Sequence, residues 1–146
     1  MGAAHLPGFG RCGISRTWPL TVPGGAAIYM QIAAHLKEYA LTFPGKEQVA
    51  IETFAGVLEQ IAGSLIRNYG LSWSKNLPEL RSYHARGLHT MGIAEGGCVD
   101  MDKLGIRELA STPRAAIRRA SDVTTLLLRV DEYFYVRELA MVHKQI

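Results

Sequence analysis

Cysteine is scarce in this chain of 146 residues, which contains only Cys12 and Cys98. The two lie far apart, form no CxxC pair and follow no regular spacing, so the sequence gives no sign of a disulfide framework. A reducing compartment is therefore the simpler interpretation, and a disulfide between the two cysteines is the alternative.

A long hydrophobic run is missing as well. The most apolar runs, 26–36 and 123–130, are shorter than the ~20 residues that a helix needs to cross a bilayer. The stretch 49–69 is long enough, but it contains two glutamates and an arginine. We therefore expect no transmembrane span. With 48% hydrophobic and 20% charged residues, the chain can instead bury a core as one small domain.

The chain also lacks the residue groupings of catalytic and metal sites. His84 and His89 are not spaced as the i, i+4 pair of a zinc helix. Asp100 and Asp102 lack the pattern that follows in a calcium loop, so helix capping is the favoured role. The glycine-rich segment 8–13 follows no strand and opens no helix, which makes it a weak phosphate loop. We predict that the protein is not an enzyme and has no catalytic residue, no metal site and no cofactor such as heme or a nucleotide.

Acidic residues are absent from the first 37 positions. This stretch holds Arg11 and Arg16 and is rich in glycine, and two interpretations of it stay open. One is an organelle-targeting leader, and the other, which we favour, is an extended arm that lies over a partner. The net charge of +3 permits a nucleic acid or an anionic membrane as partner without requiring either.

What the first half does contain is helical periodicity. Apolar residues recur at four-residue steps from Ala26 to Ala40, and Pro44-Gly45 breaks that helix. The segment 46–69 has the strongest pattern in the chain, and Gly70 stands where a C-cap glycine belongs. Its broad apolar face consists of Ile51, Phe54, Ala55, Leu58, Ile61, Ala62, Leu65 and Ile66. We predict an arm over 1–25 and a helical hairpin over 26–70, together an extension of residues 1–72.

The second half predicts a helix with Pro78 in its first turn and Gly87 at its end. A glycine-rich loop follows, and Asp100 is the expected N-cap of a short helix over 101–110. Residues 73–146 thus form a small irregular helical domain with long loops.

Two further helices complete this domain. Thr112 and Pro113 open one of them, and Asp131 opens a last helix. The predicted fold class is all-α.

The helix after Pro113 is basic. Arg114 and Arg118 share one face, whereas Arg119 points elsewhere. One interpretation is a solvated surface. The other is an anchor for an anionic partner, which could be a lipid headgroup, a heme propionate, nucleic acid or an acidic protein surface.

Several short motifs occur in order along the second half. A Gly87-Leu88 step follows the first helix, and the triplet Met91-Gly92-Ile93 comes four residues later. A turn is marked by Pro113, and the basic helix reads Ile117-Arg118-Arg119-Ala120-Ser121-Asp122-Val123. Upstream stand Trp73, Leu80, Arg81 and Tyr83. In this order, residues 73 to about 135 resemble the 14 kDa subunit 7 of the mitochondrial cytochrome bc complex, respiratory complex III. Gly96-Gly97 departs from that family, which has acidic residues there, and residues 1–72 have no counterpart in it.

The resemblance implies a non-catalytic accessory subunit of ubiquinol-cytochrome c reductase in the respiratory electron-transport chain. Such a subunit lies peripherally on the matrix side of the mitochondrial inner membrane and stabilises cytochrome b during assembly. Its partners would be cytochrome b and neighbouring small subunits, with anionic lipid headgroups as a further candidate and no nucleic acid. The implied interface residues are Trp73, Arg81, Tyr83, Gly87, Leu88, Gly92, Arg114, Arg118, Arg119 and Asp122. The alternative is a small basic helical subunit of another assembly, such as a ribonucleoprotein or another respiratory complex.

Overall fold

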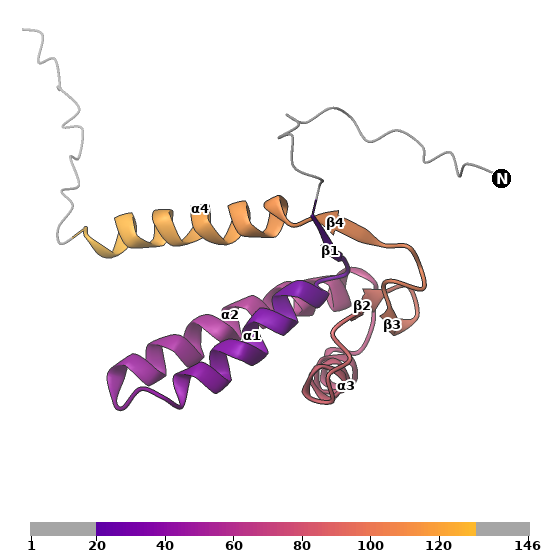
Figure 1. Cartoon of the computed structure of the whole chain (residues 1–146), viewed down its shortest axis with the longest axis horizontal. Helices are drawn as coiled ribbons and strands as arrows, with labels where there is room; N and C mark the ends of the chain where they lie inside the picture. The colour runs from indigo at the N-terminus through magenta and orange to yellow at the C-terminus, as the bar shows by residue number, and fades with distance from the viewer. Residues whose placement is uncertain (1–19, 131–146) are drawn as a thin grey trace, which may run out of the picture. The chain divides into compact units, whose positions relative to one another are not determined.

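The structure is a computed structural model that describes residues 20–130, and the chain divides into two compact units, 1–113 and 114–146. The predicted arm up to residue 19, the glycine-rich segment 8–13 and the helix expected after Asp131 lie outside the described residues. The elements are β1 (Thr21–Pro23), α1 (Ala27–Ala40), α2 (Lys46–Asn68), α3 (Trp73–Ala85), β2 (Met91–Ala94), β3 (Gly97–Asp100), β4 (Arg107–Leu109) and α4 (Ser111–Leu128) (Figure 1).

Helices α1 and α2 lie side by side and are joined by a tight turn at Gly45, which has a φ of 78° (Figure 1). Gly70 ends α2 as predicted, with a φ of 67°. Its N–H donates to Arg67 O, and the N–H of Leu71 donates to Ile66 O, which is the bond pair of a Schellman cap. The positive φ makes glycine the natural residue here, so the local sequence fixes where α2 stops.

Helix α3 begins earlier than the sequence predicts. It starts at Trp73, and Pro78 lies inside it rather than in its first turn. The carbonyl of Ser72 holds this start by accepting bonds from both the backbone N–H and the side-chain amide of Asn76. At the other end, Gly87 has a φ of 82°, and bonds from Gly87 N to His84 O and from Leu88 N to Tyr83 O form a second Schellman cap.

The all-α prediction is wrong, because four short strands pair as two ladders within the first unit. Strands β2 and β3 form an antiparallel hairpin in which Ala94 faces Gly97. The two-residue turn between them is Glu95-Gly96, and Gly96 and the following Gly97 both have positive φ. The segment predicted as a glycine-rich loop is therefore largely strand.

The helix predicted over 101–110 is also absent. Asp100 does cap a turn, because its Oδ1 accepts from the N–H of Asp102, but Gly105 with a φ of 68° stops the chain from continuing as a helix. The segment then becomes β4, which pairs with β1. Because this partner lies at the far end of the unit in sequence, local periodicity could not reveal the strand.

The core lies where α1, α2, α3 and β2 meet. Its buried members are Ala26, Met30, Ala62, Ile66, Leu77, Leu80 and Ile93. Residues from both sides of position 72 thus share one hydrophobic cluster. The division of the chain at 72/73 stays a prediction, and any separation there would open this cluster.

Helix α2 is long and apolar enough to cross a membrane by length and composition alone. Its inner face packs into the core, and the buried Glu59 on that face is ion paired. Phe54 and Ile61, which the sequence assigns to the same apolar face, are instead 39% and 37% exposed. The broad face thus splits into a covered part and an open part.

Helix α4 continues from the first unit into the second. Its start at Ser111 lies one residue from the predicted Thr112 cap, within the usual scatter of helix boundaries. Most of its side chains are exposed, the leucines at 126–128 among them.

Candidate functional site

An open pocket of about 350 Å³ lies between α1, α2, α3 and the loop after α3. Its polar lining residues are Gln31, His35, Lys37, Glu38, Glu59, Arg81, His84 and His89. Seven of these eight side chains are ionisable, which makes this pocket a place to look for chemistry.

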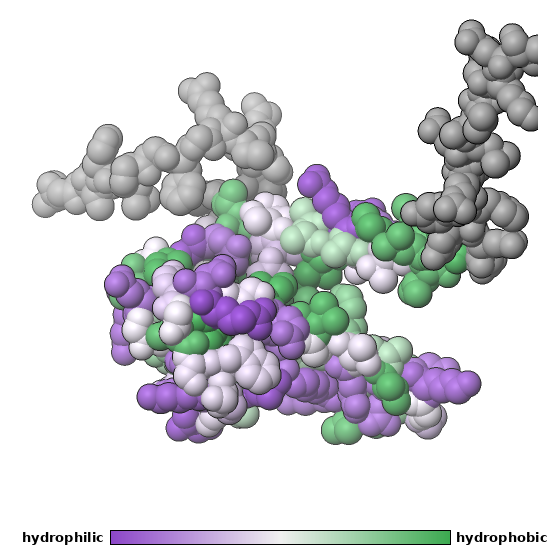
Figure 2. All heavy atoms as spheres, turned by 180° about the vertical axis from the view of Figure 1, so that it is seen from behind, coloured by the Kyte–Doolittle hydropathy of each residue, from purple (hydrophilic) through white to green (hydrophobic). Residues whose placement is uncertain are grey.

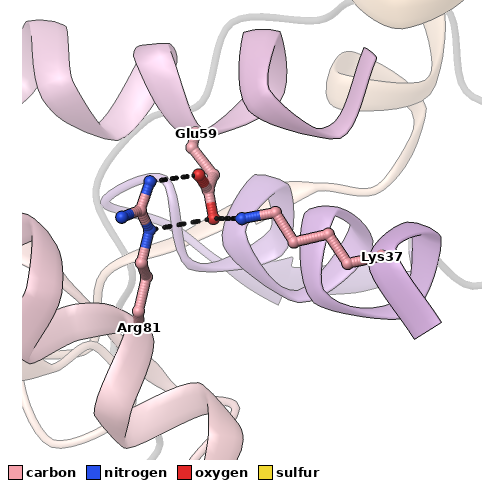
Figure 3. Close-up of polar contacts among 3 residues, drawn as sticks. All are labelled: Lys37, Glu59 and Arg81. Carbon is pink, nitrogen blue, oxygen red and sulfur yellow. Dashed lines mark hydrogen bonds and ion pairs between the residues drawn. The ribbon is translucent and has the colours of Figure 1, made fainter. Parts of the chain in front are cut away.

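At the inner end of the pocket, Glu59 of α2 is only 4% exposed and receives bonds from two cations (Figure 3). Lys37 of α1 donates from Nζ to Oε1 at 2.6 Å. Arg81 of α3 donates from Nε to Oε1 at 3.1 Å and from Nη2 to Oε2 at 2.5 Å. One carboxylate therefore joins all three helices of the unit.

Burial on its own raises the pKa of Glu59. The hydrogen bonds and positive charges of Arg81 and Lys37 outweigh that effect, so the pKa lies below its ordinary value. Glu59 is consequently ionised at neutral pH and has no proton to give to a substrate. Its role is to hold the helices together, with both oxygens already used by the two cations.

Next to this cluster, Gln31 of α1 contacts three histidines. Its Oε1 lies 3.0 Å from His84 Nδ1 and 2.5 Å from His89 Nδ1, and its Nε2 lies 3.1 Å from His35 Nε2. His84 Nε2 lies 2.8 Å from the carbonyl oxygen of Met91, which can only accept, so Nε2 carries a proton.

The charge of His84 is therefore coupled to the orientation of the Gln31 amide. An oxygen facing Nδ1 requires a doubly protonated imidazolium, whereas a neutral ring requires the amide nitrogen there. Burial lowers the pKa of His84, which favours the neutral ring at pH 7 and an amide turned by 180°. In that state the amide nitrogen donates to both Nδ1 atoms, and its oxygen accepts from His35.

The arrangement does not resemble a reaction centre. Within residues 20–130 no group of three His, Cys, Asp or Glu side chains could hold a metal ion. The thiol of Cys98 lies elsewhere, where burial and the charge of Glu79 raise its pKa to about 11, so it is a poor nucleophile. The pocket holds a charge cluster that positions the helices.

A second constrained point joins β2 to the start of α1. A Cβ added at Gly92 would lie 2.8 Å from Gly25 O and 2.9 Å from Gly24 O, too close for any side chain. The N–H of Ile93 donates to Gly25 O at 2.8 Å, which fixes this approach. Gly25 itself has a φ of 59°. Glycine is therefore required on both sides of the contact.

Three of the predicted interface residues have internal roles in the structure. Arg81 binds Glu59, Gly87 caps α3, and Gly92 makes the close backbone contact just described. Each role accounts for the residue without a partner protein.

The other predicted residues of this region lie nearer the surface. Trp73 and Leu88 are 42% and 46% exposed. Tyr83 donates its hydroxyl hydrogen to Glu79, and its ring lies beneath the Arg86 guanidinium. Trp73 and Leu88 remain proposals for an interface.

The basic helix is open to solvent in the second unit. Arg114, Arg118, Arg119 and Asp122 are all exposed on α4. Among the described residues no ion pair joins Arg118 to Asp122. That these residues contact a partner stays a prediction.

Sequence reasoning missed the pocket itself. Gln31, Lys37, Glu59 and His84 were not among the predicted site residues. Glu59 did give a signal, because it is a carboxylate on the apolar face of the most periodic helix, where a charge must be paired to be buried.

Comparisons with known proteins give one consistent result. The TCP-1/cpn60 chaperonin family matches residues 15–135. Thermosome subunit alpha of Saccharolobus solfataricus is 38% identical over 117 residues, which are 78% of this chain and 21% of that protein. Thermosome subunit beta of Sulfurisphaera tokodaii is 40% identical over 114 residues, 76% of this chain and 21% of that protein.

A solved structure agrees with these relatives. An open-state monomer of a group II chaperonin from Methanococcoides burtonii matches with a TM-score of 0.73 and 35% identity, over 75% of this chain and 28% of that chain. The chain spans about a fifth of the length of the curated relatives it matches.

These matches overturn the resemblance to subunit 7 of complex III. The inferred role as an accessory subunit of ubiquinol-cytochrome c reductase is wrong, and the alternative of a small basic helical subunit of another assembly is not supported. Cytochrome b is not the partner. The predicted location on the matrix side of the mitochondrial inner membrane depended on the same resemblance and is wrong with it.

Proposed function

The chain belongs to the TCP-1/cpn60 chaperonin family, and from that membership we propose that it works in protein folding as part of a group II chaperonin subunit. The observation that carries the proposal is the structural match to part of a group II chaperonin monomer, at a TM-score of 0.73 and 35% identity. The structural match covers 75% of the chain, and the sequence match to thermosome subunit alpha covers 78%.

The described unit suits such a role because its charged residues serve its own rigidity. Glu59 ties three helices together, and Gly92 locks the β2–β3 hairpin onto the start of α1.

Chaperonin subunits form oligomeric rings with other subunits, and we propose the same kind of partner for this chain. Hydrophobic residues reach the surface of the molecule (Figure 2), and α2 and α4 each carry exposed apolar side chains that are consistent with contacts to other chaperonin segments. This replaces the respiratory partners expected from the sequence.

The prediction that the protein is not an enzyme conflicts with its family, because chaperonins are ATPases. The matched region is about a fifth of such a subunit. We propose that ATP hydrolysis by the whole protein depends on parts of the subunit beyond this matched region, to which the present unit supplies a scaffold.

Reconstitution tests the proposal. The purified chain is mixed and refolded with thermosome subunits alpha and beta, and the particles are separated by size and imaged by negative-stain electron microscopy. We expect the chain in ring-sized particles and a changed yield of a refolded client protein. A chain that stays out of every particle, at all subunit ratios and with no effect on client refolding, contradicts the proposed function.

A further inference from the structure

The side-chain amide of Gln31 is shared by three histidines from two helices and a loop. Its Oε1 lies 3.0 Å from Nδ1 of His84 on α3 and 2.5 Å from Nδ1 of His89 in the loop after α3. Its Nε2 lies 3.1 Å from Nε2 of His35, one turn further along α1. Because an amide oxygen only accepts and an amide nitrogen only donates, the two ends of the amide make opposite demands on the rings they face.

Protonation of His84 reverses what its ring needs from the amide. The neutral ring accepts at Nδ1 and is satisfied by the amide nitrogen, which leaves the amide oxygen to accept from His35. Nε2 of His84 already donates to Met91 O at 2.8 Å, so a proton taken up at Nδ1 makes both ring nitrogens donors. The amide oxygen must then face His84, and it accepts from His89 in the same position.

His84 and His35 differ in what else can satisfy them. His84 is 4% exposed, so a buried imidazolium there depends on the amide for its second acceptor. The side chain of His35 is 71% exposed, so its ring can exchange the amide for water. A turn of the amide therefore serves the ring that has no alternative and releases the ring that has one.

The other charged groups that line the pocket do not compete for the amide. Lys37 and Arg81 donate to Glu59, and these bonds occupy both of its carboxylate oxygens. A carboxylate oxygen of Glu38 lies 3.7 Å from Nδ1 of His35, the ring nitrogen that does not face Gln31. In the part of the chain that the structure describes, the three histidines are therefore the groups whose titration acts on the amide.

We propose that Gln31 is a proton-operated switch whose amide turns by 180° when His84 and His89 are protonated. In the resting position its oxygen is bonded within α1, to His35. In the turned position the oxygen is bonded to α3 and to the loop after it, where the buried His84 has become charged. Because His84 and His89 share this oxygen, a charge on either ring favours the turn and so favours a charge on the other. The switch goes beyond the proposed function and uses residues of the first unit only.

The shared oxygen can be separated from simple repulsion by a double-mutant cycle. The pKa of His84 is measured by NMR titration in the full natural chain, His89→Ala, Gln31→Met and the combination of both. Repulsion alone makes His89→Ala raise the pKa of His84 equally with and without Gln31. With the switch, the rise should be smaller in the chain that retains Gln31, by about 0.5–1 pH unit. The matched control is Gln48→Met on α2, where Gln48 donates to Glu52, and it should leave the pKa of His84 unchanged.

Nuclear Overhauser effects from the Gln31 amide protons locate the amide directly in the natural chain. We expect these effects to reach the rings of His84 and His89 near pH 8 and the ring of His35 near pH 5. Amide protons with the same neighbours at both pH values overturn the proposal, and so does an equal rise of the pKa in both backgrounds. If Gln31→Met loses its helical circular dichroism, the Overhauser effects in the natural chain decide alone.

Discussion

The ion-paired cluster around Glu59 predicts that removing its negative charge destabilises the fold less than removing its two positive charges. The carboxylate side chain is 5% exposed, whereas Lys37 and Arg81 are 43% and 48% exposed. After Glu59→Gln, both cations can turn into water, so the loss should be limited to about 1–2 kcal/mol of unfolding free energy. After Lys37→Met with Arg81→Met, a buried carboxylate has no partner, which costs about 3–5 kcal/mol.

The pH dependence sharpens this prediction. In the natural chain the pKa of Glu59 is below 4.5, so its stabilising contribution is present above pH 4.5 and is lost as the pH falls. In the double variant only burial acts, which raises the pKa above 4.5. The double variant should then be most stable at low pH, and its unfolding free energy should fall as the pH rises through the folded-state pKa of Glu59.

The measurement is urea unfolding of the full chain between pH 4 and 7, followed by far-ultraviolet circular dichroism. The quantity compared is the difference in unfolding free energy between double variant and natural chain, in which other titrating groups cancel. We expect this difference to shrink toward pH 4. A difference that is constant with pH, or a Glu59→Gln loss as large as that of the double variant, contradicts the assigned geometry.

Other outcomes follow from single sites. Gly92→Ala should destabilise the chain by about 1–3 kcal/mol, because the added methyl group meets two backbone carbonyls. The matched control Gly56→Ala has open space around it in α2 and should stabilise the chain by about 0.5–1 kcal/mol. Thermal unfolding of the two variants distinguishes these outcomes. His84 has a pKa below 6.5, so its contribution is present above pH 6.5 and is lost as the pH falls below that value; His84→Gln should remove this step from a stability–pH profile. Cys98, with a pKa of about 11 against 9.0, should be alkylated about 100-fold more slowly at pH 8 than an unhindered thiol, as mass spectrometry of the labelled peptide would show; an equal rate would mean that the thiol is not buried.

Local signals made part of the fold predictable. The helices over 27–40 and 46–68 follow apolar periodicity, and Gly70 and Gly87 mark two helix ends because a Schellman cap requires a positive φ. These features depend on residues within one or two turns of each other. Their physics is therefore visible in a single sequence.

The strands and the pocket depend on distant partners and were not predictable in the same way. Strand β4 has three residues and exists because β1 pairs with it. The two cations that bind Glu59, Lys37 and Arg81, are each 22 residues away in sequence, one before it and one after it. The mistaken resemblance has a related cause, since Gly87 and Gly92 serve a helix end and a close backbone approach, requirements that recur in unrelated proteins.

Strands β1 and β4, near the two ends of the described part of the first unit, pair with each other, and this strand pair is called the seam below. Thr21 faces Leu109, and Arg107 reinforces the contact by donating to both Thr21 O and Thr21 Oγ1, 86 residues away. Closing a loop of that length costs on the order of 4 kcal/mol of chain entropy, against a ladder of only a few residue pairs. The seam should therefore close last during folding and exchange its amide hydrogens before the helices do. Because the chain enters and leaves the unit side by side, a longer protein could carry the unit as an insertion and open it at the seam without disturbing the helices.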